Sequence, residues 1–293
     1  AFDPQPDGKL KQVNLPAGLL PANHMLVEIL KGEDCLWVSA FDRHSFIIHL
    51  SENIIQNYAL PSINDRTQYN PAIMTLCDDG DDGDDGIMWM MQERTGLLLY
   101  NLKTDDINIY TDFSELASLS LSAGREMTRA HIHKGIWLTP DISRKVFGLN
   151  RQGMKMSLVE SVLLEEYLPS TSFVSKLLED NTGNLWIGSS TGLCIYDIKT
   201  KKIKYNNQTL GHVSSIAESR EGTIWVCTKD QGLFQMSRDG KPQLMQPGYS
   251  FSSISIAPDG LLWLGTYDGG VYSYDPNEKK LTSYNEVCRM NGN

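Results

Sequence analysis

An all-β fold built from copies of one small unit is predicted by three features of the 293-residue chain. All six tryptophans stand between two apolar neighbours, at Trp37, Trp89, Trp137, Trp186, Trp225 and Trp263. They follow one another at intervals of 52, 48, 49, 39 and 38 residues. Four of them have a glycine three positions earlier, at Gly86, Gly183, Gly222 and Gly260. A motif that recurs at a nearly constant interval indicates one supersecondary unit stacked on copies of itself.

The repeat around Trp186 shows the strands of one unit most clearly. Short apolar-rich runs alternate with turn sequences, which predicts strands at 174–180, 185–188, 193–196 and 202–205. No helical periodicity occurs in this segment, which excludes a helical solenoid. Four short antiparallel strands in about forty residues are typical of one blade of a β-propeller.

The tryptophans are interpreted as core residues. A large flat ring on an inner strand fills the wedge between neighbouring blades and buries about 150–250 Å².

The five cysteines are odd in number and form no C-x-x-C pair, at Cys35, Cys77, Cys194, Cys227 and Cys288. We expect free, buried thiols that act as small hydrophobic residues, so cysteine usage does not decide the compartment.

One propeller domain with six complete blades is expected. The predicted blades cover residues 24–60, 70–112, 126–159, 172–207, 212–247 and 250–286. Residues 1–13 resemble 274–284 and are expected to be the closing strand of a preceding blade, and 287–293 the start of the next unit. These ends favour an excerpt from a longer repeat protein with a seven-bladed ring. A six-bladed ring with the orphan strand at its edge is the alternative.

Composition excludes some classes of function. The formal net charge is −10 and no basic stripe occurs, which argues against a nucleic-acid partner. No apolar run approaches the ~18 residues of a membrane span, and no signal peptide is evident. Because the chain is expected to begin within a blade, these features do not report where a parent protein resides.

The segment Leu178–Asp197, LEDNTGNLWIGSSTGLCIYD, closely resembles the two-component regulator propeller repeat, as do residues 255–272 and 216–234. The resemblance implies the periplasmic sensor region of a hybrid two-component histidine kinase. Its parent chain would hold two seven-bladed propellers, an immunoglobulin-like domain, one membrane helix, and kinase and regulator modules. Such sensors respond to oligosaccharides from polysaccharide breakdown and signal through a homodimer. The chain itself contains no kinase motif, so a non-catalytic segment without a cofactor is expected.

Ligand contacts are predicted in the loops between second and third strands and in the connections between blades, where binding groups concentrate on a rigid scaffold. Planar donors, carboxylates and tyrosines there are suited to sugar hydroxyls. The candidate residues are Arg43, His44, Tyr69, Arg94, Arg144, Lys229, Asp230, Tyr267 and Asp268. The alternative is a solvated polar rim without a ligand.

Two groups of residues suggest metal binding, and neither suffices to predict a site. Asp78, Asp79, Asp81 and Asp82 open an acidic loop, but their spacing is not that of a calcium loop, which favours a flexible turn. His131 and His133 are expected to share one face of the third blade's first strand with Arg129. Without a third ligand, channel-lining or hydrogen-bonded histidines are favoured.

Two other functions stay open from the sequence. One is a structural or dimerisation propeller with no ligand of its own. The other is an enzyme similar to streptogramin lyases, which use a histidine base beside carboxylates and magnesium. The six histidines show no His/Glu cluster of that kind.

Overall fold

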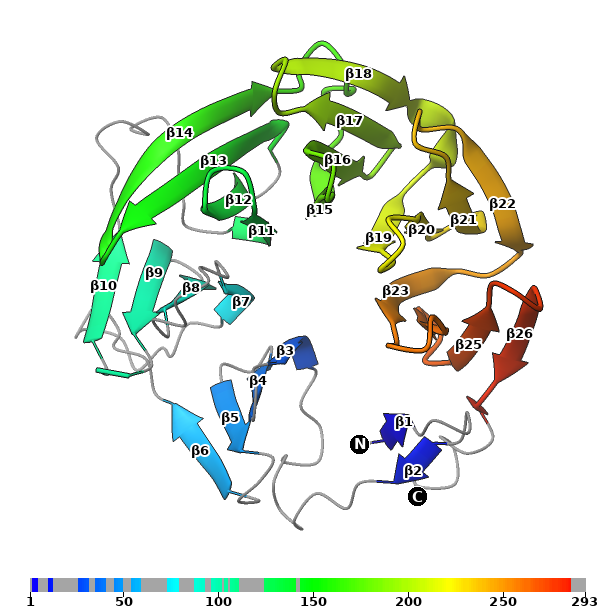
Figure 1. The fold of residues 1–293 in the computed structure, drawn as a ribbon, viewed down its shortest axis with the longest axis horizontal. Helices are drawn as coiled ribbons and strands as arrows, with labels where there is room; N and C mark the ends of the chain where they lie inside the picture. Colours follow the sequence, from blue (N-terminus) through cyan, green and yellow to red (C-terminus); the bar gives the residue numbers. More distant parts are fainter. Residues whose placement is uncertain are drawn as a thin grey trace. The chain divides into compact units, whose positions relative to one another are not determined.

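The computed structural model is all-β in the residues that it describes (Figure 1), as the sequence predicts. These residues are 2–4, 10–12, 26–31, 35–40, 45–49, 54–58, 73–78, 87–92, 96–101, 103–104, 106–110, 124–140 and 143–285. The chain divides into two compact units, 1–124 and 125–293.

The described strands form six four-stranded antiparallel sheets and one two-stranded sheet. In every four-stranded sheet the strands pair in chain order, so each sheet is a simple meander. The first unit contains β1 (Phe2–Pro4) and β2 (Leu10–Gln12), then β3 (Leu26–Lys31), β4 (Cys35–Ala40), β5 (Ser45–His49) and β6 (Ile54–Tyr58), then β7 (Ile73–Asp78), β8 (Ile87–Gln92), β9 (Gly96–Asn101) and β10 (Asp106–Tyr110).

The second unit contains four sheets, which we name A to D. Sheet A is β11 (Gly124–Ala130), β12 (Gly135–Pro140), β13 (Lys145–Gln152) and β14 (Lys155–Leu163). Sheet B is β15 (Val174–Glu179), β16 (Asn184–Ser189), β17 (Leu193–Asp197) and β18 (Lys202–Asn207). The 3-10 turn η1 (Gln208–Leu210) leads to sheet C, which is β19 (Val213–Glu218), β20 (Ile224–Thr228), β21 (Gly232–Met236) and β22 (Pro242–Pro247). Sheet D is β23 (Phe251–Ile256), β24 (Leu262–Thr266), β25 (Val271–Asp275) and β26 (Lys280–Ser283).

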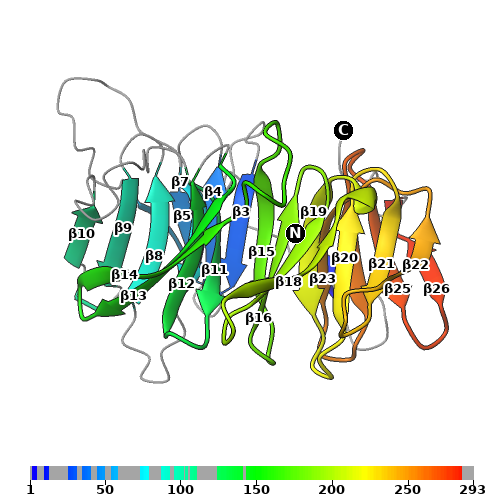
Figure 2. The ribbon, with the colours of Figure 1, turned by 90° about the horizontal axis from the view of Figure 1, so that it is seen from above.

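Neighbouring sheets of the second unit pack face to face through their inner strands. The first strands β15, β19 and β23 adjoin one another, and the fourth strands β14, β18, β22 and β26 lie on the outside (Figures 1 and 2). The strands predicted around Trp186 are confirmed, each within two residues at either end.

Three tryptophans of the second unit pack between sheets as predicted. Trp137, Trp186 and Trp225 lie on the second strands of sheets A, B and C and are at most 2% exposed. Each belongs to an apolar cluster that includes side chains of the following sheet. Trp263, on β24, is only partly buried and lies 5.0 Å from the ring of Tyr284. Cys77, Cys194 and Cys227 are buried and form no disulfide, as expected.

The turn between first and second strands corrects one prediction. β11 ends at Ala130, so His131 and His133 lie in a turn and not on the strand. Three turns of this kind use glycine with positive φ, at Gly183 (85°), Gly222 (80°) and Gly260 (87°). Lys134 occupies the corresponding position in sheet A with a φ of 51°. The turn geometry is therefore kept where the glycine is missing.

Candidate functional site

The loops between second and third strands are held by the same main-chain hydrogen bond in three successive sheets. Ser190 N donates to Phe173 O at 3.0 Å in sheet B, and Lys229 N donates to His212 O at 2.9 Å in sheet C. Tyr267 N donates to Ser250 O at 3.0 Å in sheet D. Each bond joins the start of a loop to the residues just before the sheet's first strand. We call the surface formed by Phe173, Ser190, His212, Lys229, Asp230, Ser250, Tyr267 and Asp268 the loop face.

A hydroxyl at the end of each second strand closes these loops. The hydroxyl oxygens of Ser189, Thr228 and Thr266 accept the N–H of the glycine that begins or precedes the third strand. The distances are 2.9, 2.9 and 2.8 Å, to Gly192, Gly232 and Gly270 respectively. Side-chain hydroxyls that bind nearby backbone groups fix turns of this kind. The loop face is therefore a set of short, internally hydrogen-bonded loops.

Side chains of the loop face meet across neighbouring sheets. The rings of Phe173 and His212 pack edge to face with centroids 6.0 Å apart. The Lys229 ammonium lies 5.3 Å from the centre of the Tyr267 ring, within the range of a cation–π contact. The pKa of Tyr267 is raised, first by the partial burial of its ring and second by the negative charge of Asp230. The residue is nevertheless 51% exposed.

The structure thus brings together three of the predicted ligand residues, Lys229, Asp230 and Tyr267. Asp268 lies beside them, and its carboxylate accepts a hydrogen bond from the Thr266 hydroxyl, which helps to shape the loop. Sequence reasoning missed Phe173 and His212. Both residues stand directly before the first strand of a repeat, and this shared position could have indicated that they lie on the same surface.

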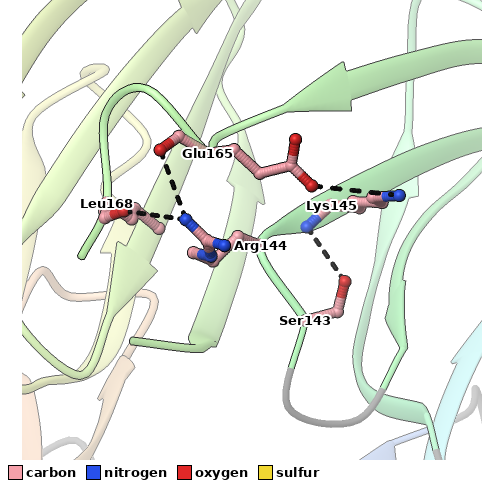
Figure 3. Close-up of polar contacts among 5 residues, drawn as sticks. All are labelled: Ser143, Arg144, Lys145, Glu165 and Leu168. Carbon is pink, nitrogen blue, oxygen red and sulfur yellow. Dashed lines mark hydrogen bonds and ion pairs between the residues drawn. The ribbon is translucent and has the colours of Figure 1, made fainter. Parts of the chain in front are cut away.

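Arg144 has a different environment from the other candidates (Figure 3). Its Nη1 atom donates to the carbonyl oxygens of Glu165 and Leu168, both at 3.2 Å. The neighbouring Lys145 forms a 3.9 Å ion pair with the Glu165 carboxylate. The guanidinium therefore holds the connection between sheets A and B.

Several predicted residues lie outside the described part of the chain. These are Arg43, His44, Tyr69 and Arg94, together with Asp79, Asp81 and Asp82. Asp78 is the last residue of β7, and its side chain is likewise not described.

No group of three metal-ligating side chains occurs among the described residues. His131 is exposed, whereas His133 packs edge to face on Trp137 with centroids 4.8 Å apart. The Nε2 atom of His133 lies 3.3 Å from the Ile136 carbonyl oxygen. Burial lowers the pKa of His133, against the raising effects of that carbonyl and of the Glu179 and Glu160 charges.

The loop face offers an exposed aromatic ring, an ammonium group and two carboxylates on a fixed backbone. Such groups can stack on the apolar face of a ring and bind several hydroxyls at once. This combination suits a hydroxyl-rich ligand.

Comparison with known proteins agrees with this architecture. Residues 167–191, which include all of β15 and β16, match the family described as the two component regulator propeller. The chain carries a two-component regulator propeller repeat. Histidine kinase P4 of Formosa agariphila is 31% identical over an alignment of 75 residues, which covers 22% of this chain and 6% of that kinase.

Solved structures show the same fold. The extracellular domain of the hybrid two component system BT3049 from B. thetaiotaomicron superposes with a TM-score of 0.71 at 20% identity, over 89% of this chain and 35% of that one. The corresponding domain of BT4673 gives 0.62 at 18% identity, over 89% and 33%. The β-propeller domain of Cps50 (Swd1) from Myceliophteria thermophila gives 0.60 at 12% identity, over 89% and 88%. The predicted β-propeller fold is confirmed, and the chain spans about a third of the extracellular domains that it matches.

Helices of the kind that cross a membrane are missing from the described part of the chain, where none reaches the necessary length and apolar character.

Proposed function

We propose that the chain is an extracellular propeller segment of a hybrid two-component sensor histidine kinase, and that it senses a ligand without catalysing a reaction. The observation that carries this proposal is the two component regulator propeller match at residues 167–191. The shared fold of two extracellular domains of hybrid two component systems supports it. The parent chain would cross the inner membrane, with this segment in the periplasm and the kinase beyond it.

The ligand proposed for this segment is an oligosaccharide from polysaccharide breakdown, bound at the loop face. Tyr267 provides an exposed ring for stacking against a sugar, and Lys229 and Asp230 provide donors and acceptors beside it. These three residues come from the loops of sheets C and D, so a bound sugar would contact both sheets.

Signalling would require the ligand to bind one arrangement of a receptor dimer more tightly than another. A ligand with equal affinity for both arrangements shifts no equilibrium. The repeated main-chain bonds of the loop face favour transmission by whole sheets, because each loop is tied to the first strand of its own sheet.

A thermal-shift screen of the chain against oligosaccharides tests this function. A ligand at a hundredfold excess over Kd stabilises the folded state by about 2.7 kcal/mol, which is readily measured. We expect Tyr267→Ala to abolish the shift that the best sugar produces. Asn277→Ala is the matched control, because Asn277 is exposed in the β25–β26 turn at the opposite end of sheet D.

Two outcomes would contradict the proposal in different ways. If no sugar shifts the melting temperature, the segment is a structural or dimerisation propeller without a ligand of its own. If a sugar shifts both variants equally, the ligand binds away from the loop face.

A further inference from the structure

The fourth strands of sheets B, C and D carry features that protect a free strand edge. Each of these strands pairs on one side only. β18 presents Lys202 and Lys204 to solvent, β22 begins and ends with proline, and β26 begins with Lys280. Lysine and proline on an edge strand discourage pairing with another chain.

β14, the fourth strand of sheet A, has less of this protection for its length, because Lys155 at its start is its only lysine. It has nine residues, more than any other described strand, and contains no proline. After Lys155 its outward-facing residues are uncharged, namely Ser157, Val159, Ser161 and Leu163. Val159 is 38% and Leu163 55% exposed. The one carboxylate within the strand, Glu160, is turned away and engaged by the Tyr196 hydroxyl at 3.2 Å and by Lys201 at 2.7 Å.

A bulge at Val159 does not distinguish β14 from β18 and β22. The register of β13 with β14 shifts between Gly148 and Leu149. Similar shifts occur where β18 pairs with β17 and where β22 pairs with β21. The length of β14 and its two exposed apolar residues, Val159 and Leu163, are therefore what set it apart.

The end of β14 opens into a preformed groove of about 630 Å³ between sheets A and B. Leu163, Tyr167 and Ile203 contribute apolar surface to its lining, and Glu165 and Glu166 contribute acidic side chains. Its wall is fixed, because the Tyr167 carbonyl oxygen accepts hydrogen bonds from the amides of Asn206 (3.1 Å) and Gln208 (2.8 Å). Arg144 holds the same connection through the carbonyl oxygens of Glu165 and Leu168 (Figure 3).

We infer that β14 pairs antiparallel with β14 of a second copy of this chain. A two-fold axis at Ser161 places Val159 of each copy opposite Leu163 of the other, so the two exposed apolar residues cover each other. The same register carries Lys155 of each copy toward Glu165 and Glu166 of the other. One end of the outward face is thus basic and the other acidic, and antiparallel pairing brings these opposite charges together.

Disulfide trapping of the full 293-residue chain tests the register. In Ser161→Cys the introduced thiols of two copies meet at the axis, and we expect mild oxidation to give a covalent dimer. Thr282→Cys, on the exposed side of β26, is the matched control, and the unsubstituted chain shows the background from the native cysteines. If Ser161→Cys forms no more dimer than Thr282→Cys, the proposed pairing is wrong.

Sedimentation equilibrium tests the surface without a new cysteine. The double variant Val159→Lys/Leu163→Lys adds charge only at exposed positions. We expect it to raise the dissociation constant of the dimer at least about tenfold. The inference would be overturned if the unsubstituted chain stays monomeric at its highest soluble concentration. It would also be overturned if the double variant dimerises as strongly as the unsubstituted chain. This inference does not rest on the proposed function, since Tyr267→Ala should leave self-association unchanged.

Discussion

The Glu179 carboxylate, at the end of β15, accepts a 2.6 Å hydrogen bond from the indole Nε1 of Trp137 on β12 of the preceding sheet. The same carboxylate accepts the backbone N–H groups of His131 (3.1 Å) and Ile132 (2.9 Å). Glu179 is 3% and Trp137 0% exposed. A buried carboxylate is costly unless donors compensate it, and here three N–H groups do so. One side chain therefore ties the core tryptophan and the turn of sheet A to sheet B.

Glu179→Gln should lower the free energy of unfolding by about 1–3 kcal/mol. Glutamine keeps the shape of the side chain, but its NH2 group cannot accept a hydrogen bond, so at least one of the three donors loses its acceptor. Urea denaturation measures the change. Glu278→Gln, at an exposed turn of sheet D, is the control, and equal stability of the two variants would contradict the role given to Glu179.

Gly260→Ala tests the backbone of the turn without a steric contribution. Gly260 has a φ of 87°, and a Cβ atom added there would meet nothing within 4 Å. We expect a loss of about 1–2 kcal/mol in unfolding free energy from backbone strain alone. Lys134→Ala is the comparison, because Lys134 already holds a left-handed conformation in the equivalent turn. A smaller loss for Gly260→Ala than for Lys134→Ala would refute this explanation.

Arg144→Lys should weaken the connection between sheets A and B. Lysine lacks the planar fork of arginine, so we expect one of the two carbonyl contacts to be lost, at a cost of about 1–2 kcal/mol in stability. Hydrogen exchange should become faster at residues 164–168. Arg238→Lys, an exposed substitution, serves as the control. If Arg144→Lys leaves stability unchanged and removes ligand binding, Arg144 belongs to the binding site.

The stability of the chain should fall as the pH decreases below about 6.5, in part because of His133. Burial lowers the pKa of His133 in the folded state, so the unfolded state binds a proton at higher pH. Between the folded and unfolded pKa values, acidification therefore favours unfolding. The denaturation midpoint, measured across pH 5–8, should depend less on pH in His133→Gln than in the unsubstituted chain. The same substitution at the exposed His131 should have less effect, and an equal effect would contradict the assignment.

The core was predictable from the sequence because it follows from a local motif. An indole between two apolar residues identifies a second strand wherever it occurs, and the burial of Trp137, Trp186 and Trp225 confirms this. The short loops of sheets C and D were also predictable, since they lie between strongly patterned strands. Lys229, Asp230 and Tyr267 were placed in these loops in that way, and the structure has them there.

Features that join two repeats were not predictable from the pattern of either one. Glu179 and Trp137 are 42 residues apart, and their contact depends on how sheets A and B pack. The turn at His131–Lys134 was missed because glycine is replaced by lysine at the left-handed position. Arg144 was placed in a loop, but its bonds to the Glu165 and Leu168 carbonyls depend on the path of a connection with no repeat pattern.

The bonds that set the loop face run between main-chain atoms, at Ser190, Lys229 and Tyr267 and the carbonyls they reach. At Lys229 and Tyr267 the identity of the side chain is therefore largely uncoupled from the course of the backbone, whereas the Ser190 hydroxyl also accepts the Phe173 N–H at 3.3 Å. Selection can exchange the lysine or the tyrosine with little penalty to folding. Receptors of the same architecture can in this way acquire new preferences through a few point substitutions, while the supporting strands stay unaltered.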